Sequence, residues 1–213
     1  MIRNNINNLR NIQGFLFSDE EMSPRQDADR DAVLNAFSPL ANSIVTKMLE
    51  AGNCYLEIAD QHPIARQEHT FQSSTLHGLI IENLSKIEGV RRSVIKKNSF
   101  LEIGSYKVWV KKLDESNLPW VNDTKSSVKR VNQKADGDDV MPVLILGYHL
   151  DQIERMSKIQ LIYIEGDQHL WAPIDLGNIA VISQTMPITV SAADELEVKV
   201  KPEKKRNRDN IAI

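Results

Sequence analysis

The sequence predicts an α+β fold in which N-terminal helices pack on a mostly antiparallel sheet of about five strands. Two patterns lead to this prediction. Apolar residues recur at helical spacing in the first part of the chain, whereas the later part contains short runs of β-branched and aromatic residues between polar turns. Because a sheet face needs an apolar cover, the helical stripe is expected to pack on it.

The helical part is expected over residues 23–89, after an Asn-rich N-terminal arm over residues 1–22. Ser23 and Pro24 are typical of a helix start, with serine at the cap and proline in the first turn. Pro39 predicts a kink, because proline lacks the N–H that its turn of helix needs. The apolar stripe of this first helix comprises Val33, Phe37, Leu40, Ile44 and Met48.

Gly52 predicts the end of the first helix, because glycine is common just beyond a helix C-terminus. Residues 54–59 fit either a helical turn or a short strand. A second helix is expected from about residue 65 or 70 to Ile87, since apolar residues again share one face.

The sheet part is expected over residues 90–185, beginning with strand-like runs at residues 90–95 and 100–113. In a strand, successive side chains point to opposite faces. One face of the second run would therefore be apolar, and the other would be basic with a tryptophan in it. These two faces comprise Tyr106, Val108 and Val110, and Lys107, Trp109 and Lys111.

The rest of the sheet part falls into three stretches. Residues 114–139 form a polar insert, in which a short helix over about residues 126–133 and then a mobile loop are expected. Residues 141–150 are nearly all apolar, which suits a central strand buried on both faces. Residues 159–174, divided by a Gly-Asp pair, predict a β-hairpin.

Residues 186–213 lack a core signal and predict a flexible charged tail, so that residues 23–185 would form a single α+β domain. Cys54 is the single cysteine, which excludes an internal disulfide and fits a reducing cytoplasm. The N-terminus has no apolar segment of signal-peptide length, and no run approaches the roughly 20 apolar residues that cross a bilayer. We therefore expect a cytoplasmic protein without a membrane partner.

The net charge of −3 conceals a segregation of charge along the chain. Residues 86–134 carry twelve basic and five acidic side chains, whereas residues 1–85 carry six and eleven, and residues 135–192 carry two and eight. A basic middle between acidic flanks predicts either charge matching within the fold or a surface that binds an anionic partner.

Motifs for catalysis and for cofactor binding are missing. The five histidines form no H-E-x-x-H pair, and one cysteine cannot build a zinc knuckle. Cys54 has no charged activator beside it, the chain has no G-x-S-x-G run, and its nine glycines form no phosphate-binding loop. The sequence therefore predicts no catalytic residue, no metal ligand and no cofactor, and it favours a protein that is not an enzyme.

A helix that carries Glu82, followed by strands with carboxylates and lysines, resembles the arrangement in restriction-type nucleases. Such nucleases need an acidic residue and an E-x-K run on adjacent strands, so that two carboxylates hold a divalent cation and the lysine helps to activate water. The D-T-K run at residues 123–125 lies in the polar insert, and the E-V-K run at residues 197–199 lies in the tail. Solvated charges are therefore favoured, and a metal-dependent nuclease would require Glu82, Glu102 and Asp114 to converge.

Basic residues gather on two neighbouring strand candidates. Lysine and arginine contact phosphates, and an aromatic side chain can stack on a base. The alternatives are a solvated sheet face and a face covered by the acidic N-terminal helix. The candidate residues for binding nucleic acid or another partner are Arg91, Arg92, Lys96, Lys107, Trp109, Lys111 and Lys112.

Three runs in the second half of the chain share a recognisable pattern. They are a G-x-Y-x-[VI]-x-x-K-K-x-D run from Gly104 to Asp114, an L-x-x-G-Y-x-L-[DN] run from Leu144 to Asp151, and Trp171 near the end of the last strand. Over about residues 76–176 the chain resembles an uncharacterised family of bacterial proteins. The resemblance implies a gene beside a helix-turn-helix regulator and a zinc-peptidase-like partner in prophage or defence-like regions, and it implies no established activity.

The first functional expectation is a non-enzymatic bacterial accessory or regulatory protein that binds another protein or a second copy of itself, in a toxin–antitoxin or phage-defence setting. The missing catalytic motifs and the segregated charge favour it, and tryptophan, of which the chain has three, is enriched at interfaces. The alternative is a nucleic-acid-binding protein, or a degenerate restriction-nuclease-like fold, that uses the basic sheet face.

Overall fold

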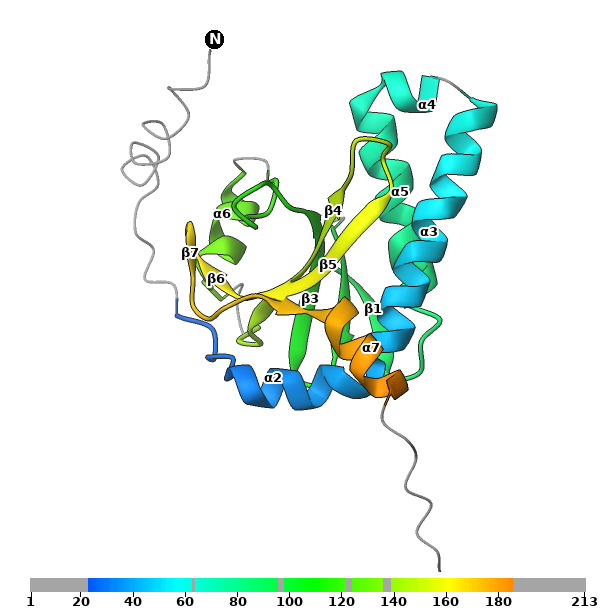
Figure 1. The fold of residues 1–213 in the computed structure, drawn as a ribbon. Helices are drawn as coiled ribbons and strands as arrows, with labels where there is room; N and C mark the ends of the chain where they lie inside the picture. Colours follow the sequence, from blue (N-terminus) through cyan, green and yellow to red (C-terminus); the bar gives the residue numbers. More distant parts are fainter. Residues whose placement is uncertain (1–22, 63, 96–97, 122–123, 136–138, 186–213) are drawn as a thin grey trace, which may run out of the picture.

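A computed structural model of the chain describes residues 23–62, 64–95, 98–121, 124–135 and 139–185 (Figure 1). The expected N-terminal arm and C-terminal tail lie outside these residues. The fold is α+β, as predicted, and its main sheet has six strands, which is slightly more than expected.

The described chain begins with helices and continues with strands, with one helix between β3 and β4 and another after β8. The helices are α2 (Arg30–Phe37), the 3-10 helix η1 (Ser38–Leu40), α3 (Ala41–Gln61), α4 (Ile64–Gln67), α5 (His69–Leu84), α6 (Lys125–Val131) and α7 (Leu176–Thr185). The strands are β1 (Val90–Ile95), β2 (Asn98–Ile103), β3 (Tyr106–Lys112), β4 (Val143–Leu150), β5 (Met156–Ile162), β6 (Ile164–Glu165), β7 (Gln168–His169) and β8 (Ile174–Asp175).

The main sheet has the strand order β1-β2-β3-β4-β5-β8. Four of the five neighbouring pairs are antiparallel, and β3 and β4 are parallel. A parallel pair needs a crossover connection, and the stretch that contains α6 supplies it. The mostly antiparallel sheet and the short helix of the insert are thus confirmed, but the sequence did not reveal the parallel pair. A separate two-stranded hairpin, β6–β7, turns at Gly166.

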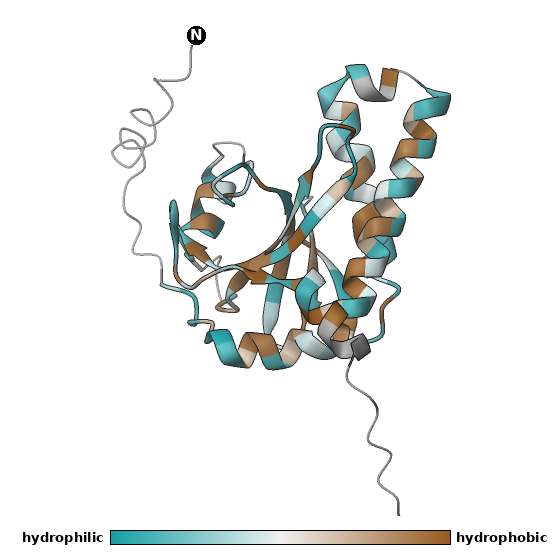
Figure 2. Ribbon diagram, viewed as in Figure 1, coloured by the Kyte–Doolittle hydropathy of each residue, from teal (hydrophilic) through white to brown (hydrophobic). Residues whose placement is uncertain are grey.

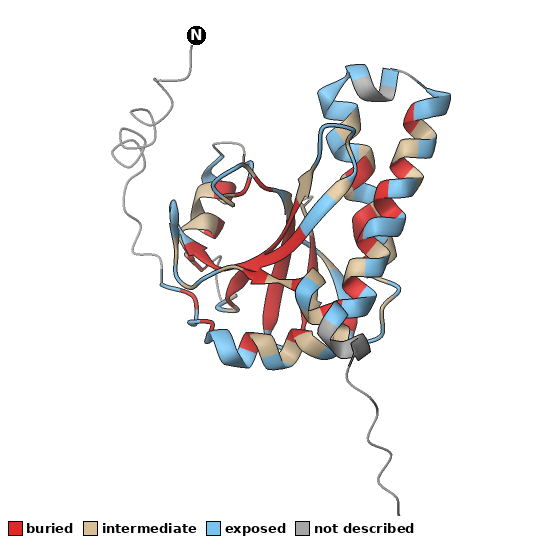
Figure 3. Cartoon of the chain, viewed as in Figure 1, coloured by how far each residue is buried: buried red, intermediate tan, exposed pale blue. Residues whose placement is uncertain are grey.

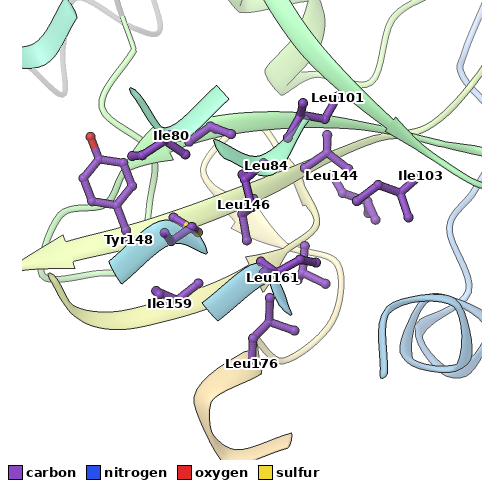
Figure 4. Packing of buried hydrophobic residues seen from close by; sticks show 14 of the residues in the cluster. Ile80, Leu84, Leu101, Ile103, Leu144, Leu146, Tyr148, Ile159, Leu161 and Leu176 are labelled. Atoms are coloured by element: carbon purple, nitrogen blue, oxygen red, sulfur yellow. The ribbon is translucent and has the colours of Figure 1, made fainter. Parts of the chain in front are cut away.

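The main core lies between the sheet and the helices α2, α3, α5 and α7 (Figure 4). The strands in the middle of the sheet are coloured mainly as hydrophobic in Figure 2 and as buried in Figure 3. Val108 of β3 and Leu146 of β4 are fully buried on this face. The predicted stripe residues Val33, Phe37 and Ile44 are fully buried against them, which confirms that the first helical segment covers the sheet.

A smaller core occupies the opposite face of the sheet, toward α6. It contains side chains from the alternate positions of the same strands, including Trp109 of β3 and Ile145 of β4, and Val131 of α6 packs against it. The sheet is therefore covered on both faces, including much of the face that the sequence analysis describes as basic.

The predicted helix start at Ser23 and Pro24 is wrong. Pro24 forms an isolated bridge with Lys134, and α2 begins only after Asp29, whose side chain accepts the backbone N–H of Ala32 (2.8 Å). Aspartate caps a helix as well as serine does, so the sequence contains two equivalent start signals and the fold uses the later one.

The predicted end of the first helix at Gly52 is also wrong, since α3 continues to Gln61 and includes residues 54–59. Gly52 is buried, and a Cβ at this position would lie 3.4 Å from the Cγ of Met156 on β5. Gly52 therefore lies inside α3, where this helix packs on β5, rather than at the end of the helix. The kink predicted at Pro39 is confirmed, because η1 interrupts the helix there.

Candidate functional site

Strands β2 and β3 separate at one end of the sheet. Their pairing runs from Ile103 to Leu101 on β2. Beyond that point, β2 continues beside β1 as far as Asn98, and β3 continues beside β4 as far as Lys112. Each strand follows a different neighbour, so the sheet opens between them.

A pocket of about 490 Å³ lies where the two strands separate. Its volume falls within the range of about 300–1,000 Å³ that is common for small-molecule sites. The pocket is lined by α5, which covers one face of the sheet, and by Trp109, which belongs to the core of the other face. The polar side chains that line it include His69, Gln72, Ser73 and His77 of α5, Asn98 and Ser99 of β2, and Lys111 and Lys112 of β3.

Trp120 lines the pocket from a tight loop that follows β3. The Asp114 carboxylate accepts hydrogen bonds from the backbone N–H groups of Ser116 and Leu118 (2.9 Å each) and so closes this loop. The backbone N–H of Trp120 then donates to the carbonyl of Lys112 (2.9 Å). The Trp120 side chain is 64% exposed, which leaves its indole accessible to a ligand.

Lys111 is the half-buried cation of the pocket. Its Nζ lies 4.2 Å from the ring centre of Trp109, a distance at which an ammonium group is attracted to an aromatic face. Burial, and then the charge of Arg130, lower the pKa of Lys111 to about 8. At pH 7 the side chain therefore still carries its charge for most of the time. Among the described residues that line the pocket, none is an aspartate or a glutamate.

His77 lines the pocket from α5. Burial, and then the charges of Lys111 and Arg92, lower the pKa of His77 below its ordinary value. Its imidazole is therefore neutral at pH 7 and offers one donor and one acceptor. Tyr148 of β4 also lines the pocket, and burial raises the pKa of its hydroxyl to about 12. The pocket thus combines cations with neutral donors and aromatic rings.

The structure does not place the sequence-predicted residues on one surface. Lys107 is 5% exposed and forms an ion pair with Asp139, which also accepts a hydrogen bond from Arg25 (3.2 Å). Trp109 is 4% exposed and packs in the smaller core. Both side chains are buried because α6 and the segments beside it cover this face. Lys96 lies outside the described residues.

Three of the predicted residues line the pocket, namely Trp109, Lys111 and Lys112, and a fourth, Arg92, lies beside it. Arg92 donates a hydrogen bond to the hydroxyl of Ser99, which lines the pocket too (3.2 Å). Arg91 is the next residue back along β1 and forms an ion pair with a glutamate of β2 instead (3.3 Å). The two arginines, which the sequence makes equivalent candidates, therefore have different partners, and only Arg92 is bonded to a residue of the pocket lining.

One lysine of the pocket can be compared with the E-x-K run that a restriction-type nuclease would need. Lys111 is the third residue of a W-V-K run on β3, so an indole stands where an E-x-K run would have a carboxylate. The lining residues of β2 are Asn98 and Ser99, both of them uncharged. Within the described part of the chain, no three or more His, Cys, Asp and Glu side chains are placed to hold a metal ion together.

The three carboxylates that a metal-dependent nuclease would bring together have separate partners. Glu82 pairs with Lys86 on the same helix (3.2 Å), and Glu102 pairs with Arg91 (3.3 Å). Asp114 closes the loop after β3. The convergence that the nuclease hypothesis requires of these three residues is therefore not present.

The places of His77 and Trp120 in this site were not predicted from the sequence. The eight-residue spacing of His69 and His77 indicates one side of a helix, and both residues do line the pocket. Nothing in the sequence shows that this side of α5 lies beside the gap between two strands. For Trp120, the Asp-Glu-Ser-Asn turn directly after a lysine-bearing strand is a signal that could have placed the indole next to Lys112.

Comparison of the chain with family models, with curated proteins and with solved structures gives no match. None of the helices in the described ranges is both long enough and apolar enough to cross a lipid bilayer.

Proposed function

We propose that this chain binds nucleic acid through the pocket between β2 and β3. The observation that carries the proposal is the position of Lys111, whose ammonium lies over Trp109 in a pocket without a carboxylate in its described lining. A cation attracts an anion more strongly when it is half buried, because less water screens the interaction. The pocket therefore favours a ligand that is anionic and carries a flat ring system.

Nucleotides have both features. Phosphate oxygens accept hydrogen bonds from ammonium and imidazole groups, such as those of Lys111 and His77, and a base stacks on an accessible indole, such as that of Trp120. Single strands offer free base faces, whereas a duplex keeps its bases stacked inside. The expected ligand is therefore a single-stranded nucleic acid.

We propose recognition rather than cleavage at this site. The lysine of a nuclease-like arrangement is present on β3, but indole, amide and hydroxyl groups occupy the neighbouring positions. Such groups bind a phosphate, but they supply no pair of carboxylates for holding a divalent cation. This proposal corresponds to the degenerate nuclease-like alternative of the sequence analysis, with a pocket in place of an open basic face.

Lys111→Met is expected to weaken the binding of short single-stranded oligonucleotides by about tenfold or more, since it removes the half-buried charge but keeps a side chain of similar length. The slope of log affinity against log salt concentration should fall by about 1, as for the loss of one phosphate contact. Fluorescence anisotropy with labelled DNA and RNA strands at several salt concentrations measures both quantities.

Lys47→Met is the matched control for this measurement. Lys47 is a lysine of α3 that pairs with Glu50 (2.6 Å) and does not line the pocket. The substitution makes the same change of net charge, and it should leave the affinity almost unchanged. Equal losses in the two variants would show a general effect of charge and would reject the pocket as the binding site.

A second candidate function is protein binding, as in the accessory or regulatory role expected first from the sequence. An exposed apolar surface at one end of the molecule favours it. Ile64 of α4, Phe71 of α5 and Ile153 of the β4–β5 turn are 61%, 48% and 61% exposed. Gln72 follows Phe71 in the sequence, and Glu154 follows Ile153. The side chains of Gln72 and Glu154 form a hydrogen bond (2.7 Å) that joins α5 to the β4–β5 turn. In Figure 1, α4 and the β4–β5 turn lie toward the same end of the molecule.

Phe71→Ser combined with Ile153→Ser is expected to abolish the co-purification of a partner with the tagged chain from native cells. Apolar side chains that are buried at an interface contribute much of the binding energy, and serine removes that contribution. Leu49 is an exposed apolar residue of α3 (41%), and Leu49→Ser is the control that should retain the partner. Recovery of the chain alone as a monomer would count against this role.

A further inference from the structure

Two nitrogen-bearing side chains line the pocket, and a third, from another element, lies beside it. Lys111 belongs to β3, His77 to α5 and Arg92 to β1. Lys111 and Arg92 are both close enough to lower the pKa of His77, and the Arg92 guanidinium reaches the hydroxyl of Ser99 in the pocket lining (3.2 Å). Further positive charge comes from Arg130 of α6, which lies over the opposite core and lowers the pKa of Lys111.

The two kinds of phosphate in a nucleic acid differ in charge. A phosphate diester within a strand carries one negative charge, whereas a phosphate monoester at its end carries about −1.5 to −2 near pH 7 and has an additional acceptor oxygen. Two cations and a neutral imidazole can give a dianion several charge-assisted hydrogen bonds at once. The charge of this pocket therefore fits a monoester better than a diester.

The pocket also offers an aromatic surface for a base. Its lining comes from α5, β2, β3, β4 and the loop after β3. Trp120, which is largely exposed, lies where the base next to a bound terminal phosphate could stack.

We propose that the pocket recognises the terminal phosphate monoester of a single-stranded nucleic acid, with the phosphate among Lys111, Arg92 and His77 and the adjacent base on Trp120. This inference rests on the proposed function and specifies which part of the strand is bound.

The test compares one oligonucleotide sequence in three forms, with a 5′-phosphate, with a 3′-phosphate and with hydroxyl groups at both ends. At least one of the phosphorylated strands is expected to bind about tenfold or more tightly than the strand without a terminal phosphate. Arg92→Gln should remove most of this preference. Arg91→Gln should retain it, because Arg91 is 80% exposed and pairs with Glu102. Both arginines are exposed, so neither substitution disturbs the core.

Four results would overturn the inference. In the first, the wild-type protein binds the three strands with equal affinity, and Lys111→Met loses this binding. That result would reject terminal recognition and leave the proposed function in place. Binding of no strand would reject both. A nucleoside monophosphate, or inorganic phosphate, that bound as tightly as the phosphorylated strand would show that a strand is not the ligand. An equal loss of preference in Arg91→Gln and Arg92→Gln would show a general charge effect.

Discussion

Asp139→Asn is expected to lower the free energy of unfolding by about 3 kcal/mol. Asp139 is the counter-charge of two cations whose side chains are almost completely buried, Lys107 (6% exposed) and Arg25 (3% exposed). Asparagine preserves the shape of the side chain but leaves two buried charges without a counter-charge. The loss is large because backbone carbonyls, such as that of Met141, which accepts a hydrogen bond from Arg25 (2.7 Å), replace lost hydration but supply no negative charge.

The effect of this substitution depends on pH in a defined direction. Burial alone would raise the pKa of Asp139, but the hydrogen bond from Lys107 and the charge of Arg25 outweigh burial and lower this pKa below its ordinary value of 3.8. A carboxyl group with a lowered pKa stabilises the fold above its unfolded-state pKa, and the contribution is lost as the pH falls through the folded-state value. The difference in the free energy of unfolding between the wild type and Asp139→Asn should have its full size at pH 7 and should shrink below about pH 4.

Urea unfolding at pH 7 and at about pH 3 measures both effects. Asp31→Asn is the control, because the Asp31 side chain is 85% exposed and lies 3.9 Å from Arg30. That exposed pair should contribute almost nothing. If Asp139→Asn unfolded at the same urea concentration as the wild type at pH 7, that result would contradict the stabilising role of the buried ion cluster.

Gly147→Ala is expected to lower the free energy of unfolding by about 2–3 kcal/mol, as is typical of an extra group forced into a packed core. A Cβ at Gly147 of β4 would lie 2.5 Å from the Cγ of Leu113. Leu113 is 3% exposed in the smaller core, and its backbone N–H donates to the carbonyl of Tyr148 (2.9 Å). Since both the side chain and the backbone of Leu113 are held, it cannot move aside freely.

A double-mutant cycle with Leu113→Ala isolates this contact. The pair of substitutions should cost less than the sum of the two alone, because the smaller side chain makes room for the new methyl group. Gly78→Ala is the control: no atom lies within 4 Å of its Cβ position on α5, and alanine there should stabilise the protein by up to about 1 kcal/mol. Additive effects of the substitutions at Gly147 and Leu113 would contradict the close packing of β4 on Leu113.

Periodicity predicted the elements and the core because burial imposes it directly. The stripe that includes Val33, Phe37 and Ile44 covers the sheet, and the nearly continuous apolar run at residues 141–150 is a central strand with a core on each face. The parallel pairing of β3 with β4 was not predicted. Local patterns do not encode the direction of a strand, and the crossover passes through a polar insert with a helix of only seven residues.

The candidate site was predicted in part. Alternation placed Lys107, Trp109 and Lys111 on one face of a strand, as the structure shows. Whether that face is exposed to solvent depends on segments distant in the sequence. Asp139 forms an ion pair with Lys107, and Trp109 is buried in the smaller core. Lys111 and one side of Trp109 remain at a pocket, because β2 leaves β3 at that level.

Several residues of the runs that resemble a bacterial family have structural roles. Gly104 adopts a positive φ of 57° in the turn between β2 and β3, which glycine does without strain. Gly147 makes room for Leu113, and Asp114 closes the loop that carries Trp120. These residues therefore hold the sheet and the loop that form the pocket, whereas the family itself and its gene neighbourhood stay predictions.

The most direct test of the nucleic-acid pocket is the response of the three indole N–H signals in a proton–nitrogen NMR spectrum to a single-stranded oligonucleotide. Trp109 and Trp120 line the pocket, whereas the indole of Trp171 donates to the carbonyl of Ala28 (3.2 Å) and serves as an internal control. The signals of Trp109 and Trp120 should shift together with one dissociation constant while that of Trp171 stays in place. Unmoved signals of Trp109 and Trp120 at a saturating concentration of oligonucleotide, or a shift of Trp171 alone, would contradict the pocket as the binding site.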